Sequence, residues 1–452
     1  MVNNYIAGFA KTVITPEKSM PMAGYINREH HATGKLDDLY ARVLYLESPL
    51  KGSVLIVSLD LIRIDNELYK ELRNTIATKY NLNPDSIHVV ATHTHSGPEI
   101  SLEVWNTKPL NHIEKELVRE YRNFLLEKIT ETVGTALNNL HPVKIQVGST
   151  QIEGVASNRV DPNGPIDNET VIITIKDSED NIRAIVINYA CHPTVLGPLN
   201  TLYSGDLAGK VSKIIEDTYN CVCLYLNGAA GNVSTRFTRR SQDYHEVEKF
   251  ASLIVNKIKE KLTQGLEEIP VSTITTTWHK ETIKLRNPPS EEELRLAEME
   301  LKRRLEEALK KNYNEAVLRG LKSDLAATLI SKERRWFLEK NRFIELEIAL
   351  TRIGDYLSIL FFPGEAFIEY QISAKQCSTT KYTVFVGYAN GYWGYIPYKK
   401  HSPKLVSYEE VVSMIDPSEY PKIEMLIKKA LGCGIKDLAL SSTLTKTKVK
   451  EV

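Results

Sequence analysis

Short apolar runs rich in β-branched residues alternate with longer amphipathic segments over the first 285 residues of the chain. The short runs are typical of buried strands, and the longer segments are typical of helices. This alternation predicts an α/β fold in which a mixed sheet is flanked by helices. Strands are expected at residues 42–46, 54–59, 87–91, 171–175, 184–189 and 222–226, and helices at 65–80, 113–140, 205–218 and 244–262.

The pattern changes between residues 290 and 341, where Glu, Lys, Arg, Leu and Ala predominate. Ser290 precedes three glutamates, which indicates a helix N-cap with an acidic first turn. We expect Gly320 to divide the segment into two helices. One interpretation of the predicted insertion, residues 288–343, is a solvated helical hairpin. The other is a lid or a dimerisation arm, and the sequence leaves both open.

Residue patterns typical of strands and helices return after this insertion. Strands are expected at 345–350, 356–362 and 382–388, and helices at 367–375 and 420–431. The Ser-, Thr- and Lys-rich residues 441–452 are expected to form a disordered tail. The sequence therefore predicts one α/β domain over residues 1–440 that carries the helical insertion.

Polar residues with metal-binding chemistry follow several of the predicted strands. His93 and His95 come directly after the 87–91 run and share one face of an extended segment. His192 follows the 184–189 run, and Glu365 follows a Pro-Gly turn. Histidine and carboxylate are common zinc ligands, and ligands of α/β sheets bind beyond the carboxyl ends of strands. Taken alone, each residue also fits a structural role, such as a hydrogen-bonded histidine or an acidic residue in the first turn of a helix.

Four further features of the sequence bear on the same candidate site. Tyr392 and Tyr395 flank a Trp-Gly pair beyond another strand, where they fit either packing roles or a role beside a metal. The glycine-rich segment 227–234 lacks the lysine and the spacing of a phosphate loop. Ser234 lacks the surroundings of a serine-hydrolase nucleophile. Arg159 by itself indicates only a surface or ion-pair residue.

Composition narrows the possible partners. The 57 basic and 57 acidic residues cancel, so no global charge favours nucleic acid or an anionic membrane. Five cysteines without Cys-x-x-Cys spacing are expected to be reduced core residues. No signal peptide and no membrane-spanning apolar run is visible in the sequence. We therefore expect a cytoplasmic protein.

Several motifs resemble, in order, the catalytic N-terminal domain of the neutral/alkaline non-lysosomal ceramidases. The central one is Ala91-Thr92-His93-Thr94-His95-Ser96-Gly97-Pro98. The others are Met22-Ala23-Gly24-Tyr25, Tyr40-Ala41-Arg42, Asn158-Arg159, His192 with Ser204-Gly205-Asp206, Gly231-Asn232-Val233-Ser234, Pro363-Gly364-Glu365, and Asn390 with Tyr392 and Tyr395.

This resemblance implies one Zn²⁺ bound by His93, His192, Glu365 and Tyr395. It also implies that His95 transfers protons during the reaction. Arg159 and Tyr408, the latter through a one-residue shift of register, would contact the scissile amide, and Ser234 falls at the active-site serine of the family. Zinc activates water and polarises a carbonyl, which suits hydrolysis of an amide.

The chain also departs from the family. Asn232 replaces a common aspartate and Thr235 a proline, and the sequence shows no C-terminal immunoglobulin-like domain. We therefore predict a divergent zinc amidohydrolase whose substrate is ceramide-like or another N-acyl compound. Two alternatives remain, a zinc hydrolase of esters or phosphoesters and a non-catalytic binding protein. A homo-oligomer formed through the insertion is also possible.

Overall fold

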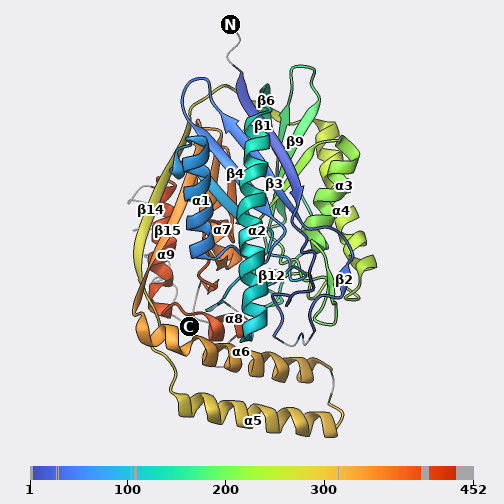
Figure 1. The fold of residues 1–452 in the computed structure, drawn as a ribbon, viewed down its shortest axis with the longest axis vertical. Coiled ribbons are helices and arrows are strands. Elements are labelled where there is room, and N and C mark those ends of the chain that lie inside the picture. Colours follow the sequence, from blue (N-terminus) through green and yellow to red (C-terminus); the bar gives the residue numbers. More distant parts are fainter. Residues whose placement is uncertain are drawn as a thin grey trace, which may run out of the picture.

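The computed structural model describes residues 4–26, 28, 30–102, 104–105, 109–313, 315–398 and 407–433. The predicted tail, residues 441–452, and the end of the predicted domain before it lie outside these described residues. The fold is α/β with mixed sheets, as the sequence predicted (Figure 1).

The larger sheet contains nine strands and includes every strand predicted before residue 285. Its path runs β11-β9-β8-β6-β1-β3-β4-β5, and β13 pairs with β6. The pairs β4–β5 and β9–β11 are parallel, and the other pairs are antiparallel. The strands are β1 (Tyr5–Val13), β3 (Tyr40–Glu47), β4 (Ser53–Leu59), β5 (Ile87–Ala91), β6 (His141–Gln151), β8 (Glu169–Lys176), β9 (Ile182–Tyr189), β11 (Val222–Asn227) and β13 (Glu267–Ile269).

A second sheet of four strands packs against the first. Its order is β14-β15-β16-β18, where only β16 and β18 are parallel. Apolar side chains of both sheets, such as Val90 of β5 and Phe361 of β16, share one buried cluster. The strands are β14 (Ile274–Lys284), β15 (Phe343–Ile353), β16 (Leu357–Phe361) and β18 (Tyr382–Val386). Short strands of two residues each pair between loops and form three small sheets. These pairs are β2 (Gly34–Lys35) with β10 (Leu202–Tyr203), β7 (Ser157–Asn158) with β12 (Val233–Ser234), and β17 (Glu365–Ala366) with β19 (Tyr395–Ile396).

Helices cover the outer faces of the two sheets (Figure 1). Helices α1 and α2 share an apolar cluster with β3, β4 and β5, and α3 and α4 share one with β9 and β11. Helices α7 and α9 pack on the second sheet. Their bounds are α1 (Asn66–Tyr80), α2 (His112–Leu137), α3 (Asp206–Tyr219), α4 (Tyr244–Gln264), α5 (Glu291–Lys310), α6 (Glu315–Lys340), α7 (Ile368–Cys377), α8 (Tyr408–Val412) and α9 (Tyr420–Ala430), with short 3₁₀ turns at Pro84–Ser86 and Pro417–Glu419.

The charged insertion forms the predicted helical hairpin, α5 and α6, between the paired strands β14 and β15. The break is not at Gly320, which lies inside α6, so that prediction was wrong. Helix α5 instead ends where Asn312 adopts a left-handed φ of 49°. Asparagine favours this conformation after a helix end, and a glycine inside a helix costs only about 1 kcal/mol.

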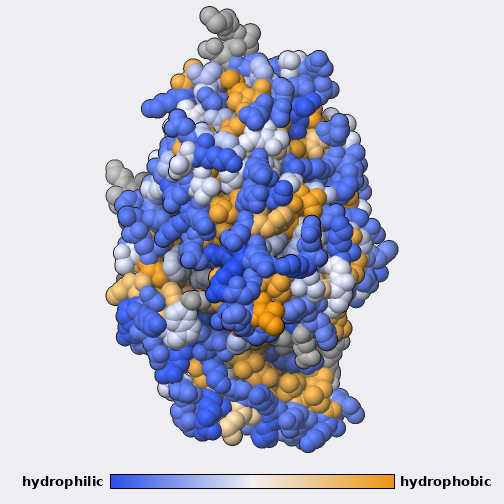
Figure 2. Space-filling view, viewed as in Figure 1, coloured by the Kyte–Doolittle hydropathy of each residue, from blue (hydrophilic) through white to orange (hydrophobic). Residues whose placement is uncertain are grey.

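The two helices of the hairpin differ in burial. Only Leu294 and Ala308 of α5 are buried, whereas Ala327, Ile330 and Leu338 of α6 belong to the core of the second sheet. Figure 2 shows apolar side chains gathered along the hairpin at the bottom of the view. Helix α6 is thus part of the domain core, and α5 is the solvated helix.

The prediction that all cysteines are reduced was also wrong. Cys377, the last residue of α7, forms a disulfide with Cys433, which lies just beyond α9. The two residues are 56 positions apart in the sequence, and packing of α7 on α9 brings them together. Cys191, Cys221 and Cys223 are free and buried.

No helix in the described part of the chain combines the length and the apolar character that a bilayer span requires.

Candidate metal centre

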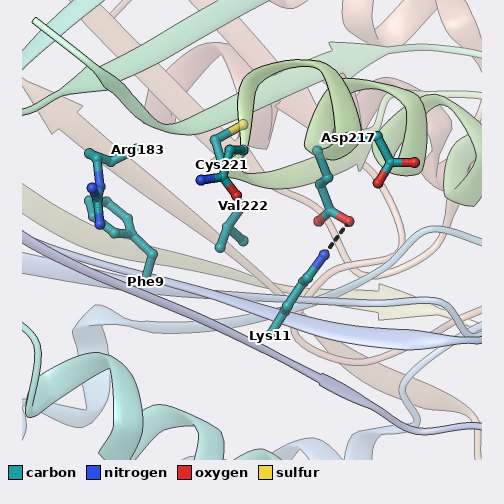
Figure 3. Close-up of a pocket in the computed structure, with 8 residues that line it drawn as sticks. Phe9, Lys11, Arg183, Asp217, Cys221 and Val222 are labelled. Carbon is teal, nitrogen blue, oxygen red and sulfur yellow. Dashed lines mark hydrogen bonds and ion pairs between the residues drawn. The ribbon is translucent and has the colours of Figure 1, made fainter.

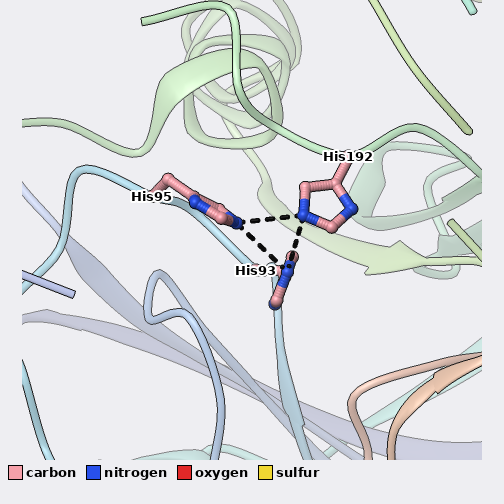
Figure 4. A group of neighbouring side chains, drawn as sticks. All are labelled: His93, His95 and His192. Carbon is pink, nitrogen blue, oxygen red and sulfur yellow. Dashed lines mark hydrogen bonds between the residues drawn. The ribbon is translucent and has the colours of Figure 1, made fainter. Parts of the chain in front are cut away.

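Three histidine side chains converge at the ends of two strands (Figure 4). His93 Nε2 lies 3.0 Å from His192 Nε2, and His95 Nε2 lies 3.3 Å from His93 Nε2 and 3.0 Å from His192 Nε2. All three side chains are buried. This group can hold a metal ion, because each ring directs one nitrogen to the same point.

Backbone carbonyl groups orient two of these rings. His93 Nδ1 donates to the carbonyl of Ile62 at 2.5 Å, and His192 Nδ1 donates to the carbonyl of Ala230 at 3.1 Å. Since a carbonyl only accepts, both protons sit on Nδ1 and both Nε2 lone pairs face the centre. A metal-binding histidine is oriented by a hydrogen bond of this kind.

Glu365 brings a carboxylate to the same point. Its Oε2 lies 3.3 Å from His93 Nε2 and 3.8 Å from His192 Nε2, and it has no hydrogen-bond donor among the described residues. Glu365 lies in β17 and not in the first turn of α7, which begins at Ile368. The helix-dipole interpretation of Glu365 is therefore excluded.

The segments that carry these histidines and Glu365 leave the sheets at equivalent places. His93 and His95 follow β5, His192 follows β9, and Glu365 follows β16. Each of these strands belongs to a parallel pair. Carboxyl ends of parallel strands gather at one edge of a sheet, so the predicted grouping of these residues at strand ends is what the fold produces.

Asn227, the last residue of β11, ties the two histidine segments together. Its Nδ2 donates to the carbonyl of Thr92 at 3.1 Å, and its Oδ1 accepts from Cys191 N–H at 3.3 Å. In the following loop Gly231 lies against the β17 backbone, where a Cβ would stand 2.4 Å from the Glu365 carbonyl oxygen. Only glycine permits this approach. Sequence reasoning noted the glycine-rich loop but missed the role of Asn227.

The two tyrosines beyond β18 have different partners. The Tyr392 hydroxyl makes a short hydrogen bond to Glu365 Oε1. The Tyr395 hydroxyl accepts from Arg159 Nη2 at 2.9 Å, and Tyr395 pairs with Glu365 through the β17–β19 backbone. Tyr392, which the resemblance left without a role, is thus the direct partner of the carboxylate.

Arg159 is not a surface residue, because its side chain is only 9% exposed. Its guanidinium forms an ion pair with Glu409 at 2.9 Å and donates to the carbonyl of Gly231 at 2.8 Å. The Tyr408 ring lies edge-on to the Tyr395 ring, with centroids 6.0 Å apart. Arg159, Tyr395 and Tyr408 therefore form one group beside the histidines.

The backbone of Ser234 pairs with that of His192 in a parallel bridge. Its Oγ accepts from Arg236 N–H at 3.2 Å, and among the described contacts none joins this Oγ to a histidine nitrogen. The roles predicted for Ser234, Arg159 and Tyr408, and the ligation of a metal predicted for Tyr395, stay predictions.

Burial determines the charge states in the centre. It lowers the pKa of His95 and His192 well below 6.5, and neighbouring positive groups lower both further. Burial would raise the pKa of Glu365, but His93, Tyr392 and Arg159 outweigh it and the net pKa is lowered. Burial raises the pKa of Tyr395 well above 10 and that of Tyr408 to about 12. His95 and His192 are therefore neutral imidazoles beside a carboxylate, and such groups are suitable donors for a divalent cation.

A separate hollow of about 490 Å³ is unrelated to this centre (Figure 3). It is lined by Lys11, Arg183 and Val222 among others, and its Lys11 already pairs with Glu216 at 2.8 Å. Val222 begins β11 and Asn227 ends it, so the hollow lies about 16 Å along the strand from the centre.

Comparison with known proteins identifies relatives of this chain. Neutral ceramidase of Oryza sativa is 26% identical over 231 residues, which are 47% of this chain and 29% of that protein. Neutral ceramidase of Pseudomonas aeruginosa is 24% identical over 251 residues, which are 51% of this chain and 37% of that protein. The matched part is thus about a third of the length of these curated relatives.

The crystal structure of the Pseudomonas aeruginosa neutral ceramidase has the same fold. It superimposes with a TM-score of 0.73 at 19% identity and covers 95% of this chain and 74% of that one. The family model described as neutral/alkaline non-lysosomal ceramidase, N-terminal, matches residues 5–237, which is more than half of the chain. The chain therefore belongs to the neutral/alkaline non-lysosomal ceramidase family.

Proposed function

We propose that the protein is a zinc-dependent hydrolase that cleaves the amide bond of an N-acyl substrate, ceramide or a similar compound. The observation that carries this proposal is the convergence of three imidazole Nε2 atoms and the Glu365 carboxylate on one buried point. The names of the relatives, neutral ceramidases, support an amide as the bond that is cleaved.

The donor atoms fit zinc. Two nitrogen ligands of a tetrahedral zinc ion lie about 3.3 Å apart when each Zn–N bond is about 2.0 Å long. The distance of 3.0 Å between His93 Nε2 and His192 Nε2, the two proposed nitrogen ligands, is close to this value. Glu365 Oε2, which is buried without a donor, would add an oxygen ligand, and Tyr395 stays the predicted fourth ligand. When bound, zinc supplies a water of lowered pKa and polarises the substrate carbonyl.

His95 has two roles that fit its position. As a neutral imidazole it accepts the proton of the attacking water and returns it to the departing amine, so the proton balance of hydrolysis closes. Its Nε2 is also as close to the other two as a third ligand would be. We propose the proton-handling role, and the variants below separate it from ligation.

We propose that Arg159 stabilises negative charge on the substrate oxygen, and that Tyr395 serves either this role or its predicted role as a zinc ligand. Because Tyr395 accepts a hydrogen bond from Arg159, the proton of the Tyr395 hydroxyl remains available for donation. Donors fixed in a buried site stabilise an oxyanion strongly, since they need no reorganisation during the reaction.

Elemental analysis of the purified chain tests the proposal. We expect about one zinc ion per chain, with loss of the metal in His192→Ala and Glu365→Ala. His95→Ala should retain zinc and lose turnover, and loss of zinc in this variant would instead make His95 a ligand. Folded protein that binds no zinc after reconstitution would contradict the proposal.

Substrate class needs a separate assay. Zinc-loaded protein should hydrolyse N-acyl amides faster than aryl esters or phosphoesters. The reverse order would favour the alternative hydrolase, and zinc binding without turnover of any class would favour a binding protein.

A further inference from the structure

Tyr388, two residues beyond β18, is in direct contact with the candidate metal centre. Its side chain is fully buried, and its ring stacks on His93 with centroids 4.0 Å apart and planes inclined by 22°. The same ring meets His192 edge-on, with centroids 6.4 Å apart. No other aromatic ring in the described part of the chain stacks on a histidine of the centre in this parallel way.

The backbone of Tyr388 is strained. Its φ of 57° is left-handed, a conformation that bulky residues rarely adopt. Strain of this kind persists only where surrounding contacts hold it, and it is concentrated at functional sites. The strain thus calls for an explanation beyond the filling of core volume.

Two hydrogen bonds hold this backbone between ligand-bearing segments. Tyr388 N–H donates to the carbonyl of Gly364 at 3.2 Å, and its carbonyl accepts from Ala91 N–H at 3.1 Å. Gly364 directly precedes Glu365, and Ala91 lies two residues before His93. One strained residue therefore connects the backbone beside the carboxylate to the backbone beside the histidine.

The stack supplies a constraint that the other contact of His93 does not. The bond from Nδ1 to the Ile62 carbonyl fixes one point of the imidazole ring. A parallel ring on its face fixes the plane as well, and together they fix the direction of the Nε2 lone pair. Groups outside the ligand shell tune a metal site by orienting ligands in this manner.

We propose that Tyr388 is a positioning residue of the metal centre, with its ring setting the plane of His93 and its backbone setting the spacing of the His93 and Glu365 segments. This inference rests on the proposed function, because it concerns zinc held by the same residues. The hydroxyl of Tyr388 makes no hydrogen bond with the described residues, so the contribution of the side chain comes from its ring and not from its hydroxyl.

Zinc titration of the full chain in competition with a chromophoric chelator tests the proposal. Tyr388→Leu removes the stack and should weaken zinc binding about tenfold or more, and Tyr388→Phe keeps the ring and should stay within about threefold of the wild type. With Co²⁺ in place of Zn²⁺, the visible absorption bands should shift in the leucine variant and coincide with the wild type in the phenylalanine variant.

Two further variants make the result unambiguous. Tyr388→Asn suits the left-handed backbone and removes the ring, so it decides the question if the leucine variant does not fold. Tyr5→Leu removes an equally buried tyrosine at the start of β1 and should leave zinc affinity unchanged.

Zinc affinity equal to that of the wild type in the leucine and asparagine variants would overturn the inference. An equal loss in the phenylalanine variant would do so too, because the ring would then not be the positioning element. If the wild type binds zinc and His192→Ala does not, such results refute only the role of Tyr388. A wild type that binds no zinc refutes the proposed function and this inference together.

Discussion

Removal of the Tyr392 hydroxyl tests which tyrosine serves the buried carboxylate. Glu365 is 3% exposed, its Oε1 accepts from Tyr392, and its Oε2 has no donor among the described residues. Tyr392→Phe therefore leaves the carboxylate without a hydroxyl donor. Hydrogen bonds to charged groups contribute about 1.5–3 kcal/mol, so the free energy of unfolding of the metal-free protein should fall by this amount.

A double-mutant cycle isolates the pair. Urea unfolding of metal-free wild type, Tyr392→Phe, Glu365→Gln and the double variant should give a coupling energy of about 1.5–3 kcal/mol. The matched cycle with Tyr395→Phe should give less than about 0.5 kcal/mol, because the Tyr395 hydroxyl binds Arg159 and not Glu365. Equal coupling in the two cycles, or coupling below 0.5 kcal/mol for Tyr392, would refute the assignment.

Three further predictions concern a buried carboxyl group, a buried ion-pair network and the exposed helix α5. Burial raises the pKa of Asp206 to about 6, so its stabilising contribution is full below about pH 4 and is lost as the pH rises through 6. Relative to Asp206→Asn, the unfolding free energy of the wild type should fall by about 3 kcal/mol between pH 4 and 7, and a flat difference in urea titrations would contradict this. The buried Arg42 guanidinium forms ion pairs with the buried carboxylates of Asp60 and Glu216 at 2.7 and 2.9 Å. Arg42→Met should therefore lower the free energy of unfolding, measured in urea, by about 3–5 kcal/mol. The control Arg183→Met, at an exposed position, should lower it by less than about 1 kcal/mol. If α5 mediates a homo-oligomer, Leu296→Glu on its exposed face should lower the molecular mass measured by light scattering. The control Leu253→Glu, at an exposed position of α4, should leave the mass unchanged. An unchanged mass in both variants would exclude α5 as the interface.

The sequence predicted the strands that carry the site because their signal is local. Each run that precedes a ligand is apolar and β-branched, and the side chain after it is polar, so strand and strand end are both visible in one segment. The grouping of His93, His192 and Glu365 followed from the geometry of parallel strands and needed no knowledge of strand order.

Features that depend on long-range register were not predictable in the same way. The 274–284 strand carries Thr, Trp, His and Lys with little apolar alternation, and its partner β15 lies beyond the entire hairpin. Tyr388 was expected to be the last residue of a strand, and nothing local shows that its backbone turns left-handed against Gly364. The choice between Tyr392 and Tyr395 as partner of Glu365 also depends on how β17 lies beside β19.

The order in which the proposed ligands appear along the chain has a consequence for how the proposed metal ion would be acquired. His93 and His95 emerge early in synthesis, His192 follows, and Glu365 comes only after both hairpin helices have been made. No short stretch of the chain contains the complete proposed donor set, so we expect that folding does not need zinc as a template, in contrast to the folding of a zinc finger. We therefore expect a stable metal-free fold that is loaded after translation is complete, and expression without zinc should yield folded protein that is activated by later addition of the ion.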